Sequence, residues 1–169
     1  MSVLEIVKYP SRILRTESTP IENIDGEIAK LVDDMLETMY DAPGIGLAAP
    51  QVGKNIRLIV LDTGQREGEK GEVYKLINPE IEFVDGENEV FEEGCLSVPN
   101  ISEKVVRPDK IIVRAVTLDE KEIEFEASGL LSRVIQHEVD HLNGKLFIDR
   151  VSKIKKELIK MKLRKMQKD

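Results

Sequence analysis

Apolar residues recur at helical spacing in three segments of the chain. Residues 23–42 repeat apolar side chains every three or four positions after Asp25, a residue type that suits the N-cap of a helix. Residues 128–144 do the same between two capping signals, a serine at the start and an Asn-Gly pair at the end. Residues 152–166 form the third such pattern. The spacing therefore predicts three helices, the last of them near the C-terminus.

Between these segments the pattern is that of β-strands. Residues 56–62 form a run rich in β-branched residues, and residues 73–86 form a strand interrupted at Pro79. Residues 110–127 predict a hairpin that turns near Asp119–Lys121. The strands follow one another without regularly alternating crossover helices, which favours antiparallel pairing. We predict an α+β fold with antiparallel β-sheets around a central buried helix that carries the segment HEVDH, and with a C-terminal helix.

Composition limits the class of protein. The length of 169 residues suits one domain, so we expect residues 1–169 to form a single domain. No apolar run approaches the ~18 residues that a membrane span needs. The N-terminal segment contains Glu5 and Lys8, which a signal peptide would not. A single cysteine excludes an internal disulfide. Together these features predict a soluble cytoplasmic protein without a membrane partner.

The charge is divided unevenly along the chain. The net charge is −7, but residues 151–169 carry eight basic and two acidic side chains and therefore +6, which leaves −13 on residues 1–150. An acidic body with a basic C-terminal helix indicates that this helix meets an anionic partner.

Two apolar stripes run along the predicted C-terminal helix. We expect the first stripe to pack on the domain; it consists of Val151, Ile154, Leu158 and Met161. The second has no obvious use in a monomer; it consists of Ile159, Leu163 and Met166.

Both histidines of the chain, His137 and His141, lie four positions apart with Glu138 between them. On a helix this spacing directs two imidazoles to one point, where they can bind a metal ion. The glutamate between them can then reach a water molecule that is bound to this ion. The helix is apolar on more than one side, which indicates burial. The alternative is a pair of core histidines satisfied by backbone partners. Asp140 on the same helix needs a cationic partner if it is buried, and we expect Arg107.

A catalytic zinc-type site needs a third protein ligand, and no third histidine exists. Cys95 in the stretch EEGCLSVP is one option, between Gly94, which permits unusual backbone angles, and Pro99, which should end regular structure. Glu157 in the basic tail is the other, as in a gluzincin-like peptidase. A core cysteine, a nucleophilic cysteine and a structural metal with a carboxylate as fourth ligand also remain open.

Three stretches together resemble the motifs of the peptide deformylases: GIGLAAPQ at 44–51, EGCLS at 93–97 and QHEVDH at 136–141. They occur in the order typical of that family, and the resemblance extends to the basic C-terminal helix. It implies one divalent metal ion per chain, naturally Fe²⁺ with Zn²⁺ or Ni²⁺ able to replace it, bound by Cys95, His137 and His141. It further implies that Glu138 is the general base and later the acid, and that Gln51 and the backbone N–H of Leu96 stabilise the oxyanion.

The resemblance also implies the substrate class, which is the N-formylmethionyl end of nascent peptides. The backbone near Gly44–Gly46 could pair with an extended peptide. We expect an apolar slot for the methionine side chain from Ile45, Phe91, Leu130 and Val134, with Glu93 and Gly94 also at the substrate. Arg133 should lay its stem along the rim of this slot and keep its charge in water. The basic helix would dock on ribosomal RNA; an anionic membrane is a weaker partner, and no DNA is expected.

Overall fold

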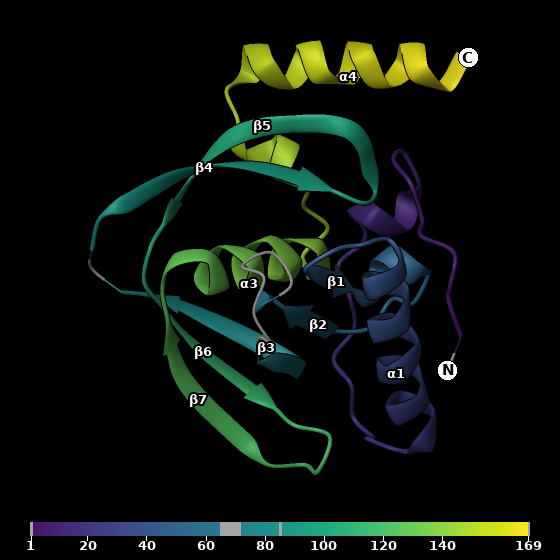
Figure 1. The fold of residues 1–169 in the computed structure, drawn as a ribbon, viewed down its shortest axis with the longest axis vertical. Coiled ribbons are helices and arrows are strands. Elements are labelled where there is room, and N and C mark those ends of the chain that lie inside the picture. Colours follow the sequence, from purple (N-terminus) through teal and green to yellow (C-terminus); the bar gives the residue numbers. More distant parts are fainter. Residues whose placement is uncertain (1, 65–71, 85, 169) are drawn as a thin grey trace.

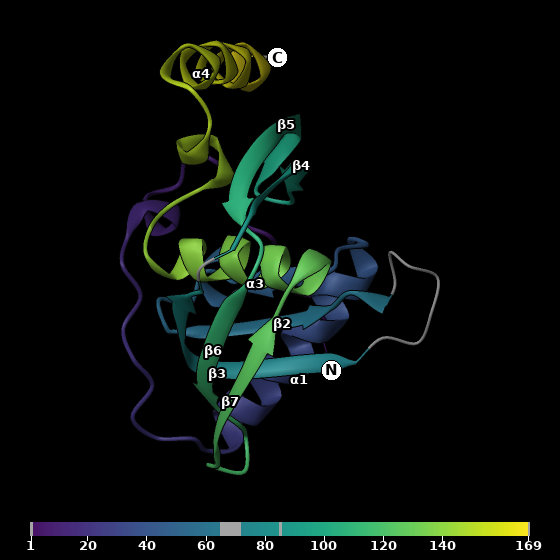
Figure 2. The ribbon, with the colours of Figure 1, turned by 90° about the vertical axis from the view of Figure 1, so that its left-hand side faces the viewer.

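Helix α3 (Gly129–Leu142) lies between two antiparallel sheets (Figures 1 and 2). The computed structural model describes residues 2–64, 72–84 and 86–168. A five-stranded sheet has the order β1-β2-β3-β6-β7, and a two-stranded sheet pairs β4 with β5. The strands are β1 (Gly46–Ala48), β2 (Leu58–Asp62), β3 (Val73–Phe83), β4 (Asn88–Cys95), β5 (Val98–Pro108), β6 (Ile111–Val116) and β7 (Glu122–Ala127). The predicted α+β fold is confirmed.

The five-stranded sheet is buried on both faces around β2. Alternate residues of a strand point to opposite faces. Ile59 and Leu61 belong to the cluster that includes α3, whereas Leu58 and Val60 pack with helix α1 (Gly26–Asp41). This explains why every residue of β2 is buried. The N-cap of α1 is as predicted, since the Asp25 side chain accepts a hydrogen bond from the Ile28 N–H at 3.1 Å.

The predicted interruption at Pro79 is a bulge in a continuous strand. The register of β3 against β6 shifts between Ile77 and Glu80, where Pro79 need not donate a ladder hydrogen bond. Asn78 adopts a positive φ of 50° and exchanges two hydrogen bonds with the backbone of Ile21, at 2.8 and 2.9 Å. The predicted hairpin at residues 110–127 is confirmed as β6 and β7.

The β4–β5 pair was not predicted, and the expectation that Pro99 ends regular structure is wrong. Cys95 pairs with Val98 across a two-residue turn, while the next pair is Gly94 with Ser102. Residues 99–101 therefore bulge out of the ladder, and a proline there costs no hydrogen bond. The turn consists of Leu96 and Ser97, directly after Cys95.

Helix α3 ends where the chain turns sharply toward the short helix η3 (Phe147–Arg150). Gly144 adopts a φ of +73°, and a Cβ at this position would lie 2.7 Å from the carbonyl oxygen of Arg15. Only glycine combines this backbone conformation with such a close approach. The turn leads into helix α4 (Lys153–Lys168), which lies outermost, above β5 (Figures 1 and 2). Within the described residues, no helix combines the length and apolar character needed to cross a membrane.

The two apolar stripes of the C-terminal segment are used in the opposite way to the prediction except at their ends, where Val151 packs on the body as predicted and Met166 is 37 % exposed. Ile159 and Leu163 are each 4 % exposed and join the cluster under β5, whereas Ile154 is 76 % exposed. Leu158 and Met161 are also exposed. Burial of Ile159 and Leu163 in this cluster favours the observed orientation. Ion pairs at the start of the helix accompany it: Lys156 contacts Asp149 of η3 at 2.8 Å, and Lys155 contacts Glu103 of β5 at 3.0 Å.

The reversed orientation predicts different costs for two isoleucines of the same helix. Ile159→Ala removes a buried side chain and should lower the free energy of unfolding by about 2–4 kcal/mol. Ile154→Ala, the matched control at an exposed position, should change it by less than about 0.5 kcal/mol. Urea unfolding measures both, and equal effects of the two substitutions would contradict this orientation of α4.

Candidate active site

The side chains of Cys95, His137 and His141 converge between the end of β4 and α3. Each offers one ligand atom, and the three atoms lie within 4.8 Å of one another. The Cys95 Sγ and His141 Nε2 atoms are 3.3 Å apart. Among the described residues, no other group of three histidine, cysteine or acidic side chains is close enough to hold an ion. Glu157 lies instead on α4, where its exposed carboxylate faces Lys160 at 3.9 Å, so the gluzincin-like ligand set is not assembled.

The chemistry of these side chains fits a divalent metal ion. One thiolate and two imidazoles suit borderline metals such as iron, zinc and nickel. Burial lowers the pKa of His141 well below its usual value, which leaves the ring neutral and able to ligate. Glu138 Oε1 is buried without a hydrogen-bond partner among the described residues, although a buried carboxylate oxygen ordinarily has one. An ion with its water would supply that partner.

Glu93 orients His137 through a buried carboxylate. Its Oε1 atom lies 2.9 Å from His137 Nδ1 and accepts from Arg107 Nη2 at 2.9 Å, while its Oε2 accepts from Arg107 Nε at 2.6 Å. Although burial alone would raise the pKa of Glu93, hydrogen bonds from His137 and Arg107 lower it to about 2. Although burial would lower the pKa of His137, its hydrogen bonds to Cys95 and Glu93 raise it above the usual value. The ionised Glu93 carboxylate would hold one proton on Nδ1, and a metal ion would replace the second proton on Nε2.

Asp140 has the cationic partner that the sequence predicts. Arg107 Nη1 donates to Asp140 Oδ2 at 2.9 Å. A second partner was missed: Arg150 of η3 donates to Asp140 Oδ1 at 2.7 Å and to Oδ2 at 3.1 Å. The sequence holds one signal for this contact, which is that a buried carboxylate needs its charge balanced.

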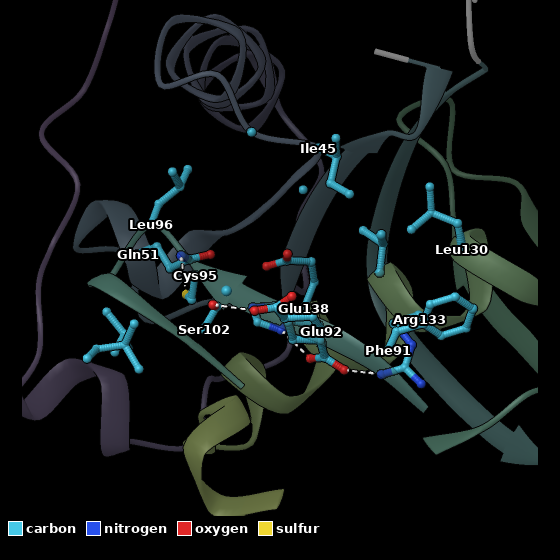
Figure 3. A pocket seen from close by; sticks show the side chains of 18 of the residues that line it. Ile45, Gln51, Phe91, Glu92, Cys95, Leu96, Ser102, Leu130, Arg133 and Glu138 are labelled. Atoms are coloured by element: carbon cyan, nitrogen blue, oxygen red, sulfur yellow. Dashed lines mark hydrogen bonds and ion pairs between the residues drawn. The ribbon is translucent and has the colours of Figure 1, made fainter. Parts of the chain in front are cut away.

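A cavity of about 1210 Å³ opens beside the ligand group. Figure 3 shows Gln51 and Leu96 on one side of it, Phe91 and Leu130 on the other, and Glu138 between them. All nine residues expected at the substrate line this cavity, namely Gly44, Ile45, Gly46, Phe91, Glu93, Gly94, Leu130, Arg133 and Val134. Sequence reasoning missed further lining residues, which include Pro43, Glu92, Val98, Asn100, Ile101 and Ser102. Most of these belong to β4, β5 and the bulge, which the hydrophobic pattern did not predict.

Arg133 does not keep its charge in water, because its side chain is buried. Its guanidinium pairs with Glu93 and donates to the carbonyl oxygens of Val105 at 3.0 Å and Glu89 at 2.7 Å. It also lies 4.8 Å from the centre of the Phe91 ring, within the range of a cation–π contact. The Arg133 charge is therefore balanced by the buried Glu93 carboxylate, which Arg107 also contacts.

The polypeptide deformylase family model matches residues 3–157. This chain belongs to the polypeptide deformylase family. It is 50 % identical over 165 residues to a peptide deformylase of Thermodesulfovibrio yellowstonii, covering 97 % of this chain and 98 % of the relative. It is 49 % identical over 169 residues to that of Syntrophobacter fumaroxidans, covering 100 % and 98 %.

Solved structures of peptide deformylases have the same fold. The enzyme of Ehrlichia chaffeensis in complex with actinonin matches with a TM-score of 0.91 and 41 % identity over 100 % of both chains. That of Legionella pneumophila matches with a TM-score of 0.89 and 42 % identity, over 99 % of this chain and 96 % of the other. Polypeptide deformylases are metal-dependent hydrolases that remove the formyl group from the N-terminal methionine of newly made peptides, and this is the activity of the chain.

Gly46 permits the close approach of β1 to helix α3 of this deformylase. A Cβ at this position would lie 2.6 Å from Glu138 Oε2 and 2.8 Å from Val134 Cγ1. Gly46→Ala should therefore displace the Glu138 carboxylate and lower the rate of formyl-peptide hydrolysis by roughly 10²-fold, since a shift of about 1 Å can cost that much.

The matched control is Gly26→Ala, where an added Cβ meets no atom within 4 Å. It should leave hydrolysis within about twofold of the parent enzyme, because a surface substitution away from any special contact has little effect. Near-normal turnover of the Gly46→Ala enzyme would show that the carboxylate does not need its present position.

Proposed function

We propose that the metal ion of this deformylase is held by Cys95, His137 and His141, and that Glu138 moves the proton in hydrolysis of the formamide bond. The observation that carries the proposal is the convergence of the three ligand atoms within 4.8 Å, beside a buried carboxylate oxygen that lacks a partner in the described chain. A bound divalent ion would lower the pKa of a water and so supply the nucleophile at neutral pH. We propose Fe²⁺ as the natural ion, which Zn²⁺ or Ni²⁺ can replace.

Glu138 is suited to both proton transfers. Burial raises the pKa of its carboxyl group to about 7, so the group can take a proton and return it near neutral pH. It would first accept a proton from the attacking water as the water oxygen bonds to the formyl carbon. It would then deliver that proton to the amine nitrogen as the carbon–nitrogen bond breaks, releasing formate and the free methionyl peptide.

Two hydrogen-bond donors, on the side of the cavity that carries Gln51 and Leu96, would stabilise the oxyanion. The Gln51 side-chain nitrogen lies 3.5 Å from Cys95 Sγ, and therefore beside the proposed ligand group. The second donor is the backbone N–H of Leu96, the first residue of the two-residue turn between Cys95 and Val98. The central residues of such a turn do not donate to the strand ladder, which leaves this N–H for a ligand.

The substrate would lie along β1, the edge strand of the five-stranded sheet. An edge strand offers unpaired backbone groups, and an extended peptide can add to it through Gly44–Gly46. The methionine side chain would enter the apolar part of the cavity formed by Ile45, Phe91, Leu130 and Val134. We propose that the enzyme works as one domain in the cytoplasm, where nascent peptides become available.

The role of Glu138 has a direct test. Glu138→Gln keeps the size of the side chain but cannot accept a proton, so hydrolysis of formyl-Met-Ala-Ser should fall by at least roughly 10²-fold. Metal content, measured by atomic absorption, should stay near one ion per chain. Glu157→Gln on α4 is the control and should alter neither quantity. Turnover of the Glu138→Gln enzyme within a few-fold of the parent would exclude this role.

We also propose that α4 docks on the ribosome. Its exposed stripe of Ile154, Leu158 and Met161 is accompanied on the helix by seven lysines and one arginine. Apolar contacts together with cations suit a surface of RNA and protein, and such binding weakens steeply with salt.

The exposed stripe allows a test that leaves the fold intact. Leu158→Asp should lower co-sedimentation with ribosomes at low salt by about tenfold or more, because it places a negative charge in the proposed contact. Hydrolysis of formyl-Met-Ala-Ser should remain within about twofold, since position 158 is exposed and a surface change has little effect on the fold. Ile154→Asp should act alike, and unchanged co-sedimentation of both variants would rule out docking through this face.

A further inference from the structure

The side-chain amide of Gln51 is held at both ends. The residue lies in the short helix η2 (Ala49–Val52) and is 2 % exposed. Its Oε1 atom accepts a hydrogen bond from the backbone N–H of Ala48 at 2.9 Å. Its Nε2 atom donates to Ser97 Oγ at 3.2 Å, and Ser97 is completely buried. The amide therefore has little freedom to rotate.

These contacts decide which way the amide faces. The Ala48 N–H can only donate, so it must meet the oxygen of the amide and not the nitrogen. The nitrogen then faces Ser97 and Cys95, and it has two N–H groups. When Ser97 accepts one of them, the other donates to Cys95 Sγ at 3.5 Å, at the edge of the cavity where the oxyanion would form.

The backbone around this pair is fixed independently of the serine hydroxyl. The Val7 N–H donates to the carbonyl oxygen of Gln51 at 2.7 Å, and the Tyr9 N–H donates to that of Ser97 at 2.8 Å. The N-terminal segment thus connects η2 to the turn after β4. Removal of the Ser97 hydroxyl should leave this connection in place and free only the Gln51 amide.

We propose that Ser97 is a positioning residue for the deformylation reaction, whose hydroxyl orients the Gln51 amide so that one N–H faces the oxyanion. This inference rests on the proposed role of Gln51. The serine hydroxyl oxygen acts in this role as the acceptor for the glutamine amide. A donor that is already oriented in the free enzyme stabilises the transition state without the cost of reorganisation.

A double-mutant cycle tests the proposal with formyl-Met-Ala-Ser as substrate. Gln51→Ala should lower kcat by roughly 10²–10³-fold, the usual cost of one oxyanion donor. Ser97→Ala should lower kcat by about tenfold with KM and metal content within about twofold, because the interaction is made mainly in the transition state. In the Gln51→Ala enzyme, Ser97→Ala should have less than about a twofold further effect, since its target is gone.

The chain contains a matched control for the loss of a buried hydroxyl. Ser132 is 1 % exposed, and its Oγ accepts a hydrogen bond from Gln136 Nε2 at 3.0 Å, on α3 and outside the cavity. Ser132→Ala therefore removes the same kind of contact without touching Gln51. It should leave kcat within about twofold, since a single buried hydrogen bond contributes to stability and not to this reaction.

The outcomes separate the two claims. Additive losses in the cycle, an equal loss of kcat in Ser132→Ala, or a rise in KM at unchanged kcat would overturn the positioning role of Ser97. A full effect of Gln51→Ala with no effect of Ser97→Ala would also overturn it, while the role of Gln51 would stand. An unaltered kcat in Gln51→Ala would overturn both.

Discussion

The structure depends on the buried carboxylate of Glu93. An ionised carboxylate in a protein interior is tolerated only when its charge is balanced and its oxygens are hydrogen-bonded. Glu93 comes from β4, Arg107 from β5, and Arg133 and His137 from α3, so this requirement binds the two-stranded sheet to the helix. Cys95 follows Glu93 by two residues on the same strand and is thereby brought to within reach of both histidines.

The same set of charges continues to the C-terminal part of the chain. Arg107 also contacts Asp140, and Asp140 contacts Arg150 of η3. The ring of Phe147, in the same short helix, is stacked on that of His137 with 6.1 Å between centroids. The chain that leads into α4 is therefore attached to the helix that carries the proposed ligands, while α4 itself presents its exposed stripe away from the body.

Much of the fold and some of the site follow from local pattern. The spacing of apolar residues predicted α1, α3, α4, β2 and the β6–β7 hairpin, because helices and half-buried strands impose periods that are visible in the chain. The segment HEVDH placed two imidazoles and a carboxylate on one helix for the same reason. The β4–β5 pair has no such signal, since β4 exposes most of its residues and β5 contains a bulge at Pro99.

The sequence by itself determined which residue types were available: two histidines on one helical turn, one cysteine, and two apolar stripes on the last helix. Residue spacing left Cys95 and Glu157 both open as the third ligand, and the family motifs favoured Cys95; the tertiary structure decided that Cys95 lies beside the histidines and that Ile159 and Leu163 face the body. Both choices concern which segments meet in space. They were settled by the balancing of Glu93 between β4, β5 and α3, and by the burial of Ile159 and Leu163 in the cluster under β5. Periodicity along a chain fixes the face of an element but not the neighbour that this face will meet.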